Sequence, residues 1–301
     1  MLPTAVQIRE VGPRDGFQNE PEIIATPDKI ALIDALGRTG LARLEVTSFV
    51  RADRIPQLAD AEDVLRGIRV PDGVAVSVLI PNERGLNRAL EVGRIDEVNV
   101  FLSASETHNR KNVGRSIEES LAGVSIVLER ARAAGLRCEG MISTSFGCPY
   151  EGRVEPRKVL ELARALLDAG AQEVGFGDTT GMANPLSVRR FFSDALARLP
   201  AAAELTAHFH NTRGQGLANV LAALEVGVSS FESSFGELGG CPVPPGATGN
   251  IATEDLVSML HEMNVHSGID LDALLACSRR AQRVLGRPLG SHTLVAGGVQ
   301  W

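Results

Sequence analysis

The stretch LTAHFHNTRGQG, residues 205–216, starts as a short apolar run, ends that run on two histidines and continues into a polar turn. If residues 205–210 form a strand, its two-residue period places His208 and His210 on the same face. Residues 216–226 then show helical periodicity, and Gly227 precedes another short run at 230–233. The unit is therefore strand, helix, strand, and two imidazoles at a strand end form a natural chelate for a divalent metal.

The same alternation runs from one end of the 301-residue chain to the other, without a composition break. Eight β–α repeats in a single domain predict a parallel (β/α)8 TIM barrel. A doubly wound sheet is the competing fold, but no glycine-rich nucleotide fingerprint follows the first strand. The predicted strands are residues 6–9, 42–46, 74–80, 97–101, 137–142, 173–177, 205–210 and 230–233, and helical patterns include 29–38, 117–134, 157–169, 185–198 and 216–226.

The C-terminal part departs from this repeat. Residues 251–285 have a helical pattern, whereas residues 291–301 carry no clear signal. We therefore expect residues of about 251–301 to form a helical extension of one catalytic domain spanning 1–301.

Composition narrows the class of protein. The net charge of −7 argues against a nucleic-acid or anionic-membrane partner, and no apolar run approaches the roughly 20 residues that span a bilayer. The N-terminus does not resemble a signal peptide. The four cysteines form no C-x-x-C pair, so a reduced cytoplasmic protein without a structural zinc is expected. A homodimer is expected only because it is the commonest assembly of such barrels.

Barrel enzymes build their sites at the C-terminal ends of the strands, and several polar residues fall there. Two His, a carboxylate and an amide oxygen suit Mg²⁺, Mn²⁺, Co²⁺ or Zn²⁺ with open positions. The residues at those ends are Arg14 and Asp15 after the first strand, Glu45 on the second, Asp178 on the sixth, His208 and His210 on the seventh, and Cys241 and Asn250 beyond the eighth.

Each candidate also has an ordinary structural explanation. Asp15, in the turn Gly12–Gly16, is equally consistent with hydrogen bonds to its own backbone, and Asp178 with capping of the following turn. Glu45 lies in an apolar strand, where an unpaired carboxylate is costly, so a functional role is favoured. Arg14 is a candidate partner of Glu45 or an anion clamp.

Cys241 lies in a loop of unusual composition, with glycines at 239, 240, 246 and 249 and prolines at 242, 244 and 245. Such a loop is able to close over a site, where the thiol would donate a proton to a carbanion. By contrast, we interpret Cys148 and Cys277 as structural. We leave His108, His261, His266 and His292 without a ligand role.

Taken together, these motifs resemble the 3-hydroxy-3-methylglutaryl-CoA (HMG-CoA) lyase family. The cysteine loop together with the H-x-H pair upstream is the specific element, whereas R-D-G and H-x-H alone are shared with a wider group of metal-dependent barrel synthases and aldolases. The resemblance covers residues 6 to about 290. It is carried by Val11–Glu20, Glu45–Val50, Ala104–Glu106, Lys111–Asn112, Ser116–Ser120, Gly147–Gly152, Gly177–Thr179 and Gly239–Val257.

The resemblance implies one divalent metal, Mg²⁺ or Mn²⁺ before Co²⁺ or Zn²⁺, held by Asp15, His208, His210 and Asn250. It implies retro-Claisen cleavage of a 3-hydroxyacyl-CoA to acetyl-CoA and a ketoacid, a reaction of leucine degradation and ketone-body metabolism. Asp178 and His208 both remain candidates for the base. Arg14 would stabilise the enolate, Glu45 would orient Arg14 or the metal's water shell, and Cys241 would protonate the enolate carbon or gate the site. Asn112 and Ser116 would lie near the CoA.

Some positions depart from the family pattern. They are Pro21 after Gln-Asn-Glu, Glu139-Gly140-Met141 in the fifth strand, Val243-Pro244-Pro245 in the cysteine loop and the His-Asn-Thr-Arg of residues 210–213. None removes a ligand or the cysteine, so the acyl group is the open question, and a C3 substituent bulkier than methyl is one hypothesis.

Two other functions remain as alternatives. A synthase of the isopropylmalate or homocitrate type shares the Asp and H-x-H pattern, but it usually carries a further C-terminal region and has no need of the cysteine loop. A barrel that binds a CoA ester without turnover is disfavoured by the intact ligand and cysteine set.

Overall fold

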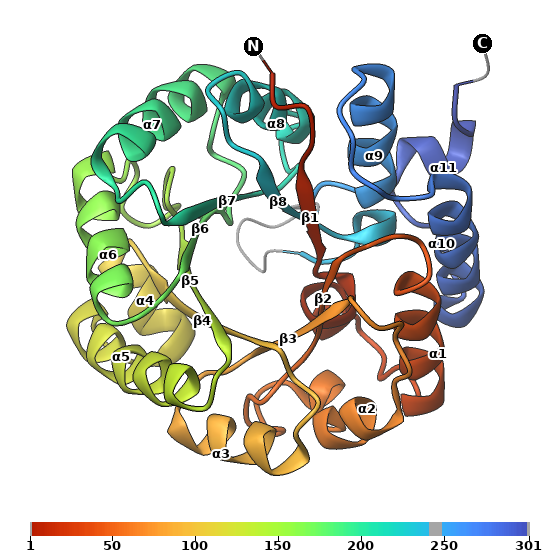
Figure 1. Cartoon of the computed structure of the whole chain (residues 1–301), viewed down its shortest axis with the longest axis horizontal. Coiled ribbons are helices and arrows are strands. Elements are labelled where there is room, and N and C mark those ends of the chain that lie inside the picture. Colours follow the sequence, from red (N-terminus) through yellow and green to blue (C-terminus); the bar gives the residue numbers. More distant parts are fainter. Residues whose placement is uncertain (1, 241–248, 300–301) are drawn as a thin grey trace.

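A closed barrel of eight parallel strands forms the centre of the protein (Figure 1). The computed structural model describes residues 2–240 and 249–299. Each strand pairs with its neighbours in chain order, and β8 closes the barrel on β1, with Arg9 opposite Glu232. The predicted (β/α)8 TIM barrel is therefore confirmed.

The strands lie within two residues of their predicted bounds at either end. Their short apolar runs, each closed by a turn, are the reason that they are visible in the sequence. They are β1 (Gln7–Glu10), β2 (Arg43–Ser48), β3 (Ala75–Leu79), β4 (Glu97–Ser103), β5 (Arg137–Ser143), β6 (Glu173–Asp178), β7 (Glu204–Phe209) and β8 (Ser230–Ser233).

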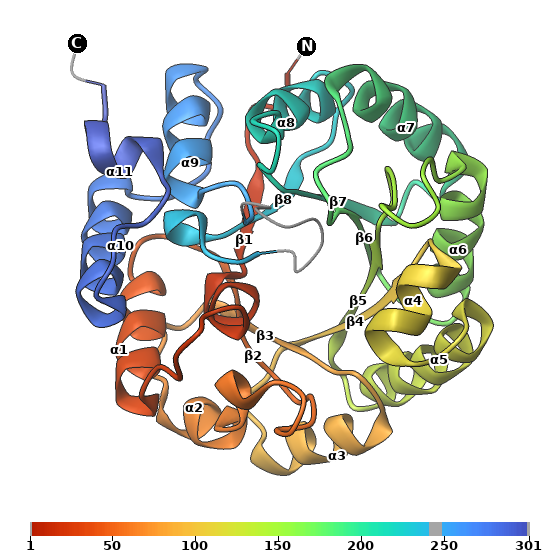
Figure 2. The same ribbon diagram turned by 180° about the vertical axis from the view of Figure 1, so that it is seen from behind.

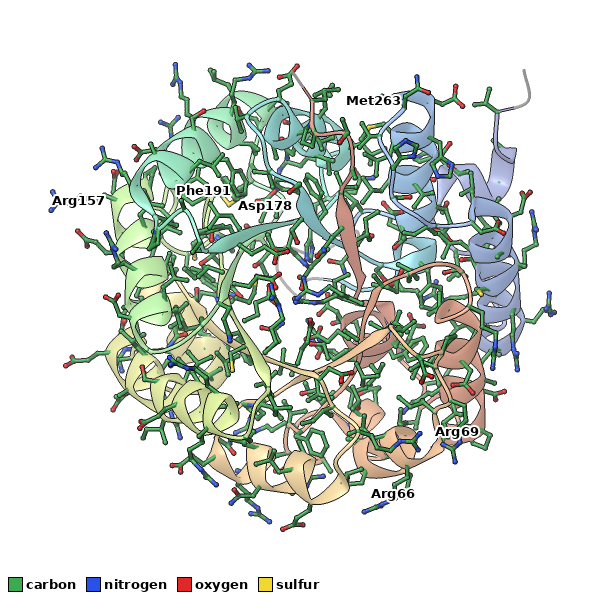
Figure 3. The ribbon with its side chains drawn as sticks, in the orientation of Figure 1. Arg66, Arg69, Arg157, Asp178, Phe191 and Met263 are labelled. Atoms are coloured by element: carbon green, nitrogen blue, oxygen red, sulfur yellow. The ribbon has the colours of Figure 1, made fainter. Side chains whose placement is uncertain are left out.

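Helices surround the barrel (Figure 2). Their buried apolar side chains belong to the hydrophobic core around the strands. On α7, Phe191 packs edge-to-face against Phe176 of β6, with ring centroids 4.9 Å apart. Arg66, Arg69 and Arg157, by contrast, point outward at the rim (Figure 3). The ring consists of α1 (Thr26–Leu36), α2 (Ala61–Gly67), α3 (Glu83–Val92), α4 (Glu106–Val113), α5 (Ile117–Ala133), α6 (Pro156–Asp168), α7 (Pro185–Arg198) and α8 (Gly216–Leu224).

The C-terminal segment forms a helical group beside β1 and α1 rather than one long helix (Figure 1). Its helices are α9 (Thr253–Glu262), α10 (Leu271–Leu285) and α11 (His292–Ala296). The helical pattern predicted over 251–285 is thus interrupted. Asn264 has a φ of 55°, and the backbone of His266 bonds to Thr4 and Val6, which holds this stretch as an extended connection to the N-terminal segment. In the part of the chain that the structure describes, no helix is long and apolar enough to cross a membrane.

Candidate active site

The first site element is a single π-helical turn, η1 (Gly12–Gly16), immediately after β1. It was expected to be an ordinary polar turn; a π-helical turn often marks a functional site. It presents Arg14 and Asp15 together. The Arg14 Nε atom donates to Glu45 Oε2 at 2.5 Å, and Asn99 donates to Glu45 Oε1 at 3.0 Å. The inward carboxylate of Glu45 is therefore paired, with Arg14 as the partner considered for it in the sequence.

Asp15, His208 and His210 converge at the C-terminal end of the barrel. One potential ligand atom from each lies within 4.8 Å of the others. The Nε2 atoms of His208 and His210 are 3.1 Å apart, so both rings turn the same nitrogen to one point. The shared direction of these rings is the one expected of alternate residues on a strand.

Asn250 completes this cluster through backbone pairing. Asn250 forms an isolated bridge with His210, and the amide of Ile251 bonds to Phe209 O at 3.1 Å. The Asn250 side chain donates to Asp15 Oδ2 at 2.8 Å and to Leu238 O at 3.2 Å.

Those two contacts leave Asn250 Oδ1 buried without a hydrogen-bond partner among the described residues. A buried amide oxygen without a donor is costly unless a cation satisfies it. The donor set of one carboxylate, two imidazoles and one amide oxygen fits a divalent cation.

Local charge favours the same assignment. Burial would raise the pKa of Asp15, but Arg14 and His208 bring it below its usual value, so the carboxylate is ionised. Burial and the nearby His208 lower the pKa of His210 to about 3, so this ring stays neutral and keeps a lone pair for a metal.

A cavity of about 440 Å³ opens above these residues. Its wall combines polar and apolar side chains. The cavity is lined by Arg14, Asp15, Gln18, Asn19, Val50, Ile55, Leu79, Asn99, Phe101, His108, Lys111, Asn112, Met141, Ser143, Tyr150, Gly177, Thr179, His208, His210, Glu232 and Gly240.

Comparison with known proteins agrees with this geometry. The HMGL-like family model matches residues 5–280. The chain belongs to the HMGL-like family. It is 49% identical over 292 residues to a hydroxymethylglutaryl-CoA lyase of Bacillus subtilis, covering 97% of both chains.

Solved structures give the same result for the fold. The B. subtilis HMG-CoA lyase superposes with a TM-score of 0.95 at 48% identity, over 98% of both chains. An HMG-CoA lyase of Acinetobacter baumannii, in complex with coenzyme A and 3-methylmalate, superposes with a TM-score of 0.93 at 43% identity, over 98% of this chain and 96% of the other.

Asp178 of this HMGL-like chain lies at the end of β6. Its Oδ1 atom accepts from the backbone of Met182 at 2.8 Å and of Ala183 at 3.0 Å, which is the capping role considered above. Its Oδ2 atom is buried without a described partner, and its neighbours Gly177 and Thr179 line the cavity. Desolvation raises the pKa of Asp178 to about 7, even though these backbone bonds oppose the shift.

The two predicted CoA-contacting residues differ in position. Asn112 lines the cavity, whereas Ser116 is not among the lining residues. The Ser116 hydroxyl instead accepts from Glu119 N at 3.1 Å, and the Glu119 carboxylate in turn accepts from Ser116 N. The two bonds form a capping box at the start of α5. Cys241 lies outside the described residues; Gly240, the residue before it, lines the cavity.

Sequence reasoning missed several residues at this site. His108, left without a role, lines the cavity on α4 and bonds through Nδ1 to Ser103 at 3.1 Å. Glu232 also lies at the cavity, directly opposite His208 in the register of β7 and β8. The signal for Glu232 was available, because a carboxylate in a strand paired with the H-x-H strand points to the same interior. Cys148 and Cys277 are buried, as their structural interpretation predicts.

Proposed function

We propose that this HMGL-like protein is a divalent-metal-dependent carbon–carbon lyase. It cleaves HMG-CoA, or a close 3-hydroxyacyl-CoA, to acetyl-CoA and acetoacetate or the matching ketoacid. The observation that carries the proposal is the convergence of Asp15, His208 and His210 at a cavity, beside the Asn250 oxygen that has no hydrogen-bond partner among the described residues. That donor set sits at the end of the barrel where such enzymes carry out chemistry.

The metal would be held by these four residues. A bound Mg²⁺ or Mn²⁺ supplies Lewis-acid stabilisation of negative charge on the substrate hydroxyl and its neighbouring oxygens. The same donors also accept Co²⁺ or Zn²⁺, since no thiolate enforces a choice.

Asp178 is the better candidate for the base. His208 uses Nδ1 in a hydrogen bond to Glu232, and its Nε2 faces the ligand cluster, so neither nitrogen is left to take a proton. Asp178 has one free oxygen and a pKa of about 7, near the pH at which an enzymatic base works best. We therefore assign to Oδ2 of Asp178 the acceptance of the hydroxyl proton as the carbon–carbon bond breaks; this role requires Oδ2 to reach the cavity, because Asp178 is not itself among the residues that line it.

Arg14 is the candidate for stabilising the enolate. Its guanidinium lines the cavity and is held by Glu45 and Asp15, so it is already oriented before substrate enters. A preorganised cation at a developing oxyanion lowers the barrier without reorganisation at the moment of reaction. Glu45 is a positioning residue, because it acts through Arg14.

Cys241 separates the lyase from a synthase of the same barrel class. We assign its thiol the protonation of the enolate carbon, as the resemblance of its loop to the family signature implies. Replacing Cys241 with Ala should abolish most turnover of a lyase and leave metal affinity unchanged. A forward condensation has no need of this proton donor, so a variant with native turnover would favour the synthase.

We infer that the apolar lining residues Val50, Leu79, Phe101 and Met141 limit the size of the acyl group. The A. baumannii relative is in complex with CoA and a small methyl-branched hydroxydicarboxylic acid, which supports a substrate of this class. Comparing HMG-CoA with analogues that carry longer C3 branches tests whether this lining accepts more than methyl. A strong preference for the methyl substrate would contradict a wider pocket.

The first experiment is a stopped assay with HMG-CoA and Mg²⁺ or Mn²⁺ in the presence of a thiol reductant. Acetoacetate and acetyl-CoA should form in equal amounts, and EDTA should prevent both. Absence of product with HMG-CoA, but metal-dependent product with a longer-branched analogue, would keep the lyase and change its substrate. Absence of cleavage with both, together with formation of the condensed product from acetyl-CoA and a ketoacid, would replace the lyase by a synthase.

A further inference from the structure

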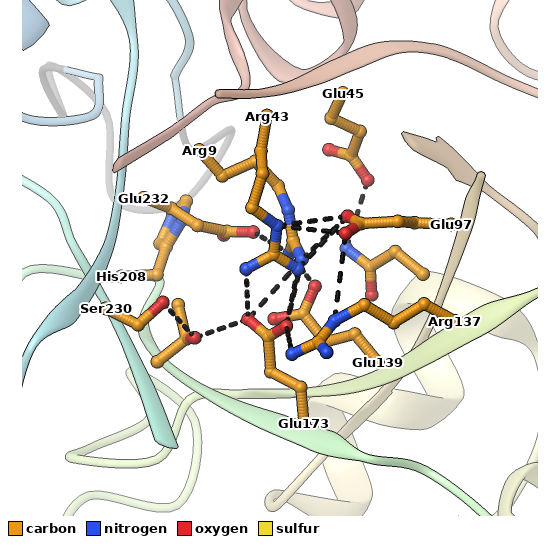
Figure 4. Close-up of polar contacts among 12 residues, drawn as sticks. Arg9, Arg43, Glu45, Glu97, Arg137, Glu139, Glu173, His208, Ser230 and Glu232 are labelled. Carbon is orange, nitrogen blue, oxygen red and sulfur yellow. Dashed lines mark hydrogen bonds and ion pairs between the residues drawn. The ribbon is translucent and has the colours of Figure 1, made fainter. Parts of the chain in front are cut away.

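Below the candidate metal cluster, the barrel interior holds charged side chains where many barrels pack aliphatic ones (Figure 4). Arg9 of β1 and Arg43 of β2 lie among glutamates from β4, β5, β6 and β8. None of these groups is needed for the reaction as described so far. One of them, Glu232, touches both this network and His208.

We propose that Glu232 is a positioning residue that fixes the tautomer and the orientation of His208 for metal binding, and that Arg9 holds Glu232 in place. The proposal rests on the metal site proposed above and goes beyond it, because it assigns the selection of the ligand nitrogen to a carboxylate of the neighbouring strand.

The strand register creates the contact. His208 and Glu232 are paired positions on β7 and β8, so both side chains point into the barrel at the same height. His208 Nδ1 lies 2.8 Å from Glu232 Oε2. An ionised carboxylate only accepts hydrogen bonds, so Nδ1 carries the proton and Nε2 presents its lone pair to the cluster with Asp15 and His210.

Arg9 keeps Glu232 ionised and immobile. Its Nη1 atom donates to Glu232 Oε1 at 2.9 Å, and the guanidinium is almost fully buried. Arg9 is itself fixed from the other side, since Nη2 donates to Glu173 at 3.3 Å and to Glu97 at 3.4 Å. Two successive polar contacts therefore connect the barrel interior to the candidate metal ligand, from Arg9 to Glu232 and from Glu232 to His208.

Both oxygens of Glu232 are acceptors, and an amide cannot replace both. In Glu232→Gln the single oxygen faces either Arg9 or His208, while the NH₂ group faces the other. If the NH₂ faces His208, it favours the tautomer with the proton on Nε2, which cannot bind a metal. If it faces Arg9, two donors oppose each other in a buried site. Either outcome weakens the metal site.

The test measures metal affinity directly, by titrating Mn²⁺ into EDTA-treated protein and following free Mn²⁺ by electron paramagnetic resonance. Glu232→Gln should bind Mn²⁺ about 10- to 100-fold more weakly than the native protein, the usual loss when the partner of a ligating histidine is removed. Glu97→Gln is the matched control, because it removes the same charge from the same Arg9 network without touching His208. Its affinity should remain close to native.

Three results would overturn the proposal: native affinity in Glu232→Gln, an equal loss in Glu97→Gln, or the wrong tautomer in the native protein. The tautomer of His208 is measured on the native protein, so this result does not depend on whether a variant with a changed barrel interior folds. Long-range ¹H–¹⁵N spectra of the histidine-labelled, Mg²⁺-loaded native protein should show His208 protonated at Nδ1, and His208→Asn serves only to assign its signal. If the native protein binds no divalent metal, the proposed function itself fails. If the native protein binds metal but one of the three results above is found, only the role of Glu232 fails.

Discussion

Asp178, the proposed base, is the residue at which the proton-transfer step is best tested. Asp178→Asn keeps the oxygen that caps the turn before α7, so the fold and the metal affinity should be retained. If Oδ2 is the base, kcat should fall by roughly 10²- to 10⁴-fold, the usual contribution of a positioned general base. Steady-state kinetics with the metal affinity measured in parallel separates loss of the base from loss of the site.

The pH profile gives a second reading of the same residue. The base must be deprotonated to act, and desolvation raises the pKa of Asp178 to about 7. Native kcat/KM should therefore rise with pH, bend near pH 7 and level off above it. If Asp178→Asn keeps the native kcat, Asp178 only caps the turn before α7, and another group is the base.

At the scale of the elements, Gly239, two residues after η3 (Phe235–Glu237), has little room for a side chain. Gly239 has a φ of 113°, and a Cβ there would lie 2.7 Å from Asn250 Nδ2. Gly239→Ala should therefore displace the amide that completes the ligand set. We expect a loss of about 1–3 kcal/mol in the free energy of unfolding and weaker Mn²⁺ binding, measured by denaturation and by metal titration.

The adjacent glycine provides the control for this prediction. A Cβ at Gly240 would meet nothing nearer than 3.9 Å, so Gly240→Ala should change neither the stability nor the metal affinity appreciably. Equal effects of the two substitutions would mean that the segment tolerates no side chain at all, rather than that Gly239 alone must approach Asn250.

These elements also show what the sequence was able to predict. The eight strands followed from apolar runs closed by turns, and His208 and His210 followed from the strand period. The π-helical turn did not, because Gly-Pro-Arg-Asp-Gly has the composition of an ordinary turn. The break after α9 was missed because the helical pattern continues through residues whose backbone is held by the N-terminal segment. Glu232 was missed because a carboxylate in the eighth strand indicates an inward side chain, but its contact with His208 depends on the register between two strands, which neither strand reveals alone.

At the scale of the whole molecule, the charged interior replaces apolar packing with a set of mutually dependent ion pairs. Glu173 illustrates this dependence: burial would raise its pKa, yet Arg9 and Arg43 lower it to about 2. Buried pairs of this kind contribute little net stability, but breaking one partner leaves an uncompensated charge. The interior is therefore better suited to fixing side chains near the site than to stabilising the barrel.

A different buried carboxylate, Glu10 at the end of β1, governs how the stability of the whole protein varies with pH. It joins β1 to the C-terminal helices by accepting hydrogen bonds from Gly12 N, Phe235 N and Thr253 Oγ1. Desolvation by burial raises the pKa of Glu10 to about 8 in spite of these bonds. The folded state therefore retains a proton that the unfolded chain loses near its ordinary pKa.

The consequence is a loss of stability as pH rises. Below the unfolded pKa both states are protonated and Glu10 has no effect; between that value and about 8 only the unfolded state ionises, so the free energy of unfolding declines. The decline should be on the order of 2–4 kcal/mol, since each unit of pKa difference corresponds to about 1.4 kcal/mol. The side chain of Glu10→Gln cannot ionise. In urea denaturation from pH 5 to 9, the free energy of unfolding of this variant should therefore decline less than that of the native protein, and the difference should grow toward high pH. Glu129→Gln, on the exposed face of α5, should follow the native curve; a Glu10→Gln profile parallel to native would mean that the Glu10 carboxyl is already ionised in the folded protein at neutral pH.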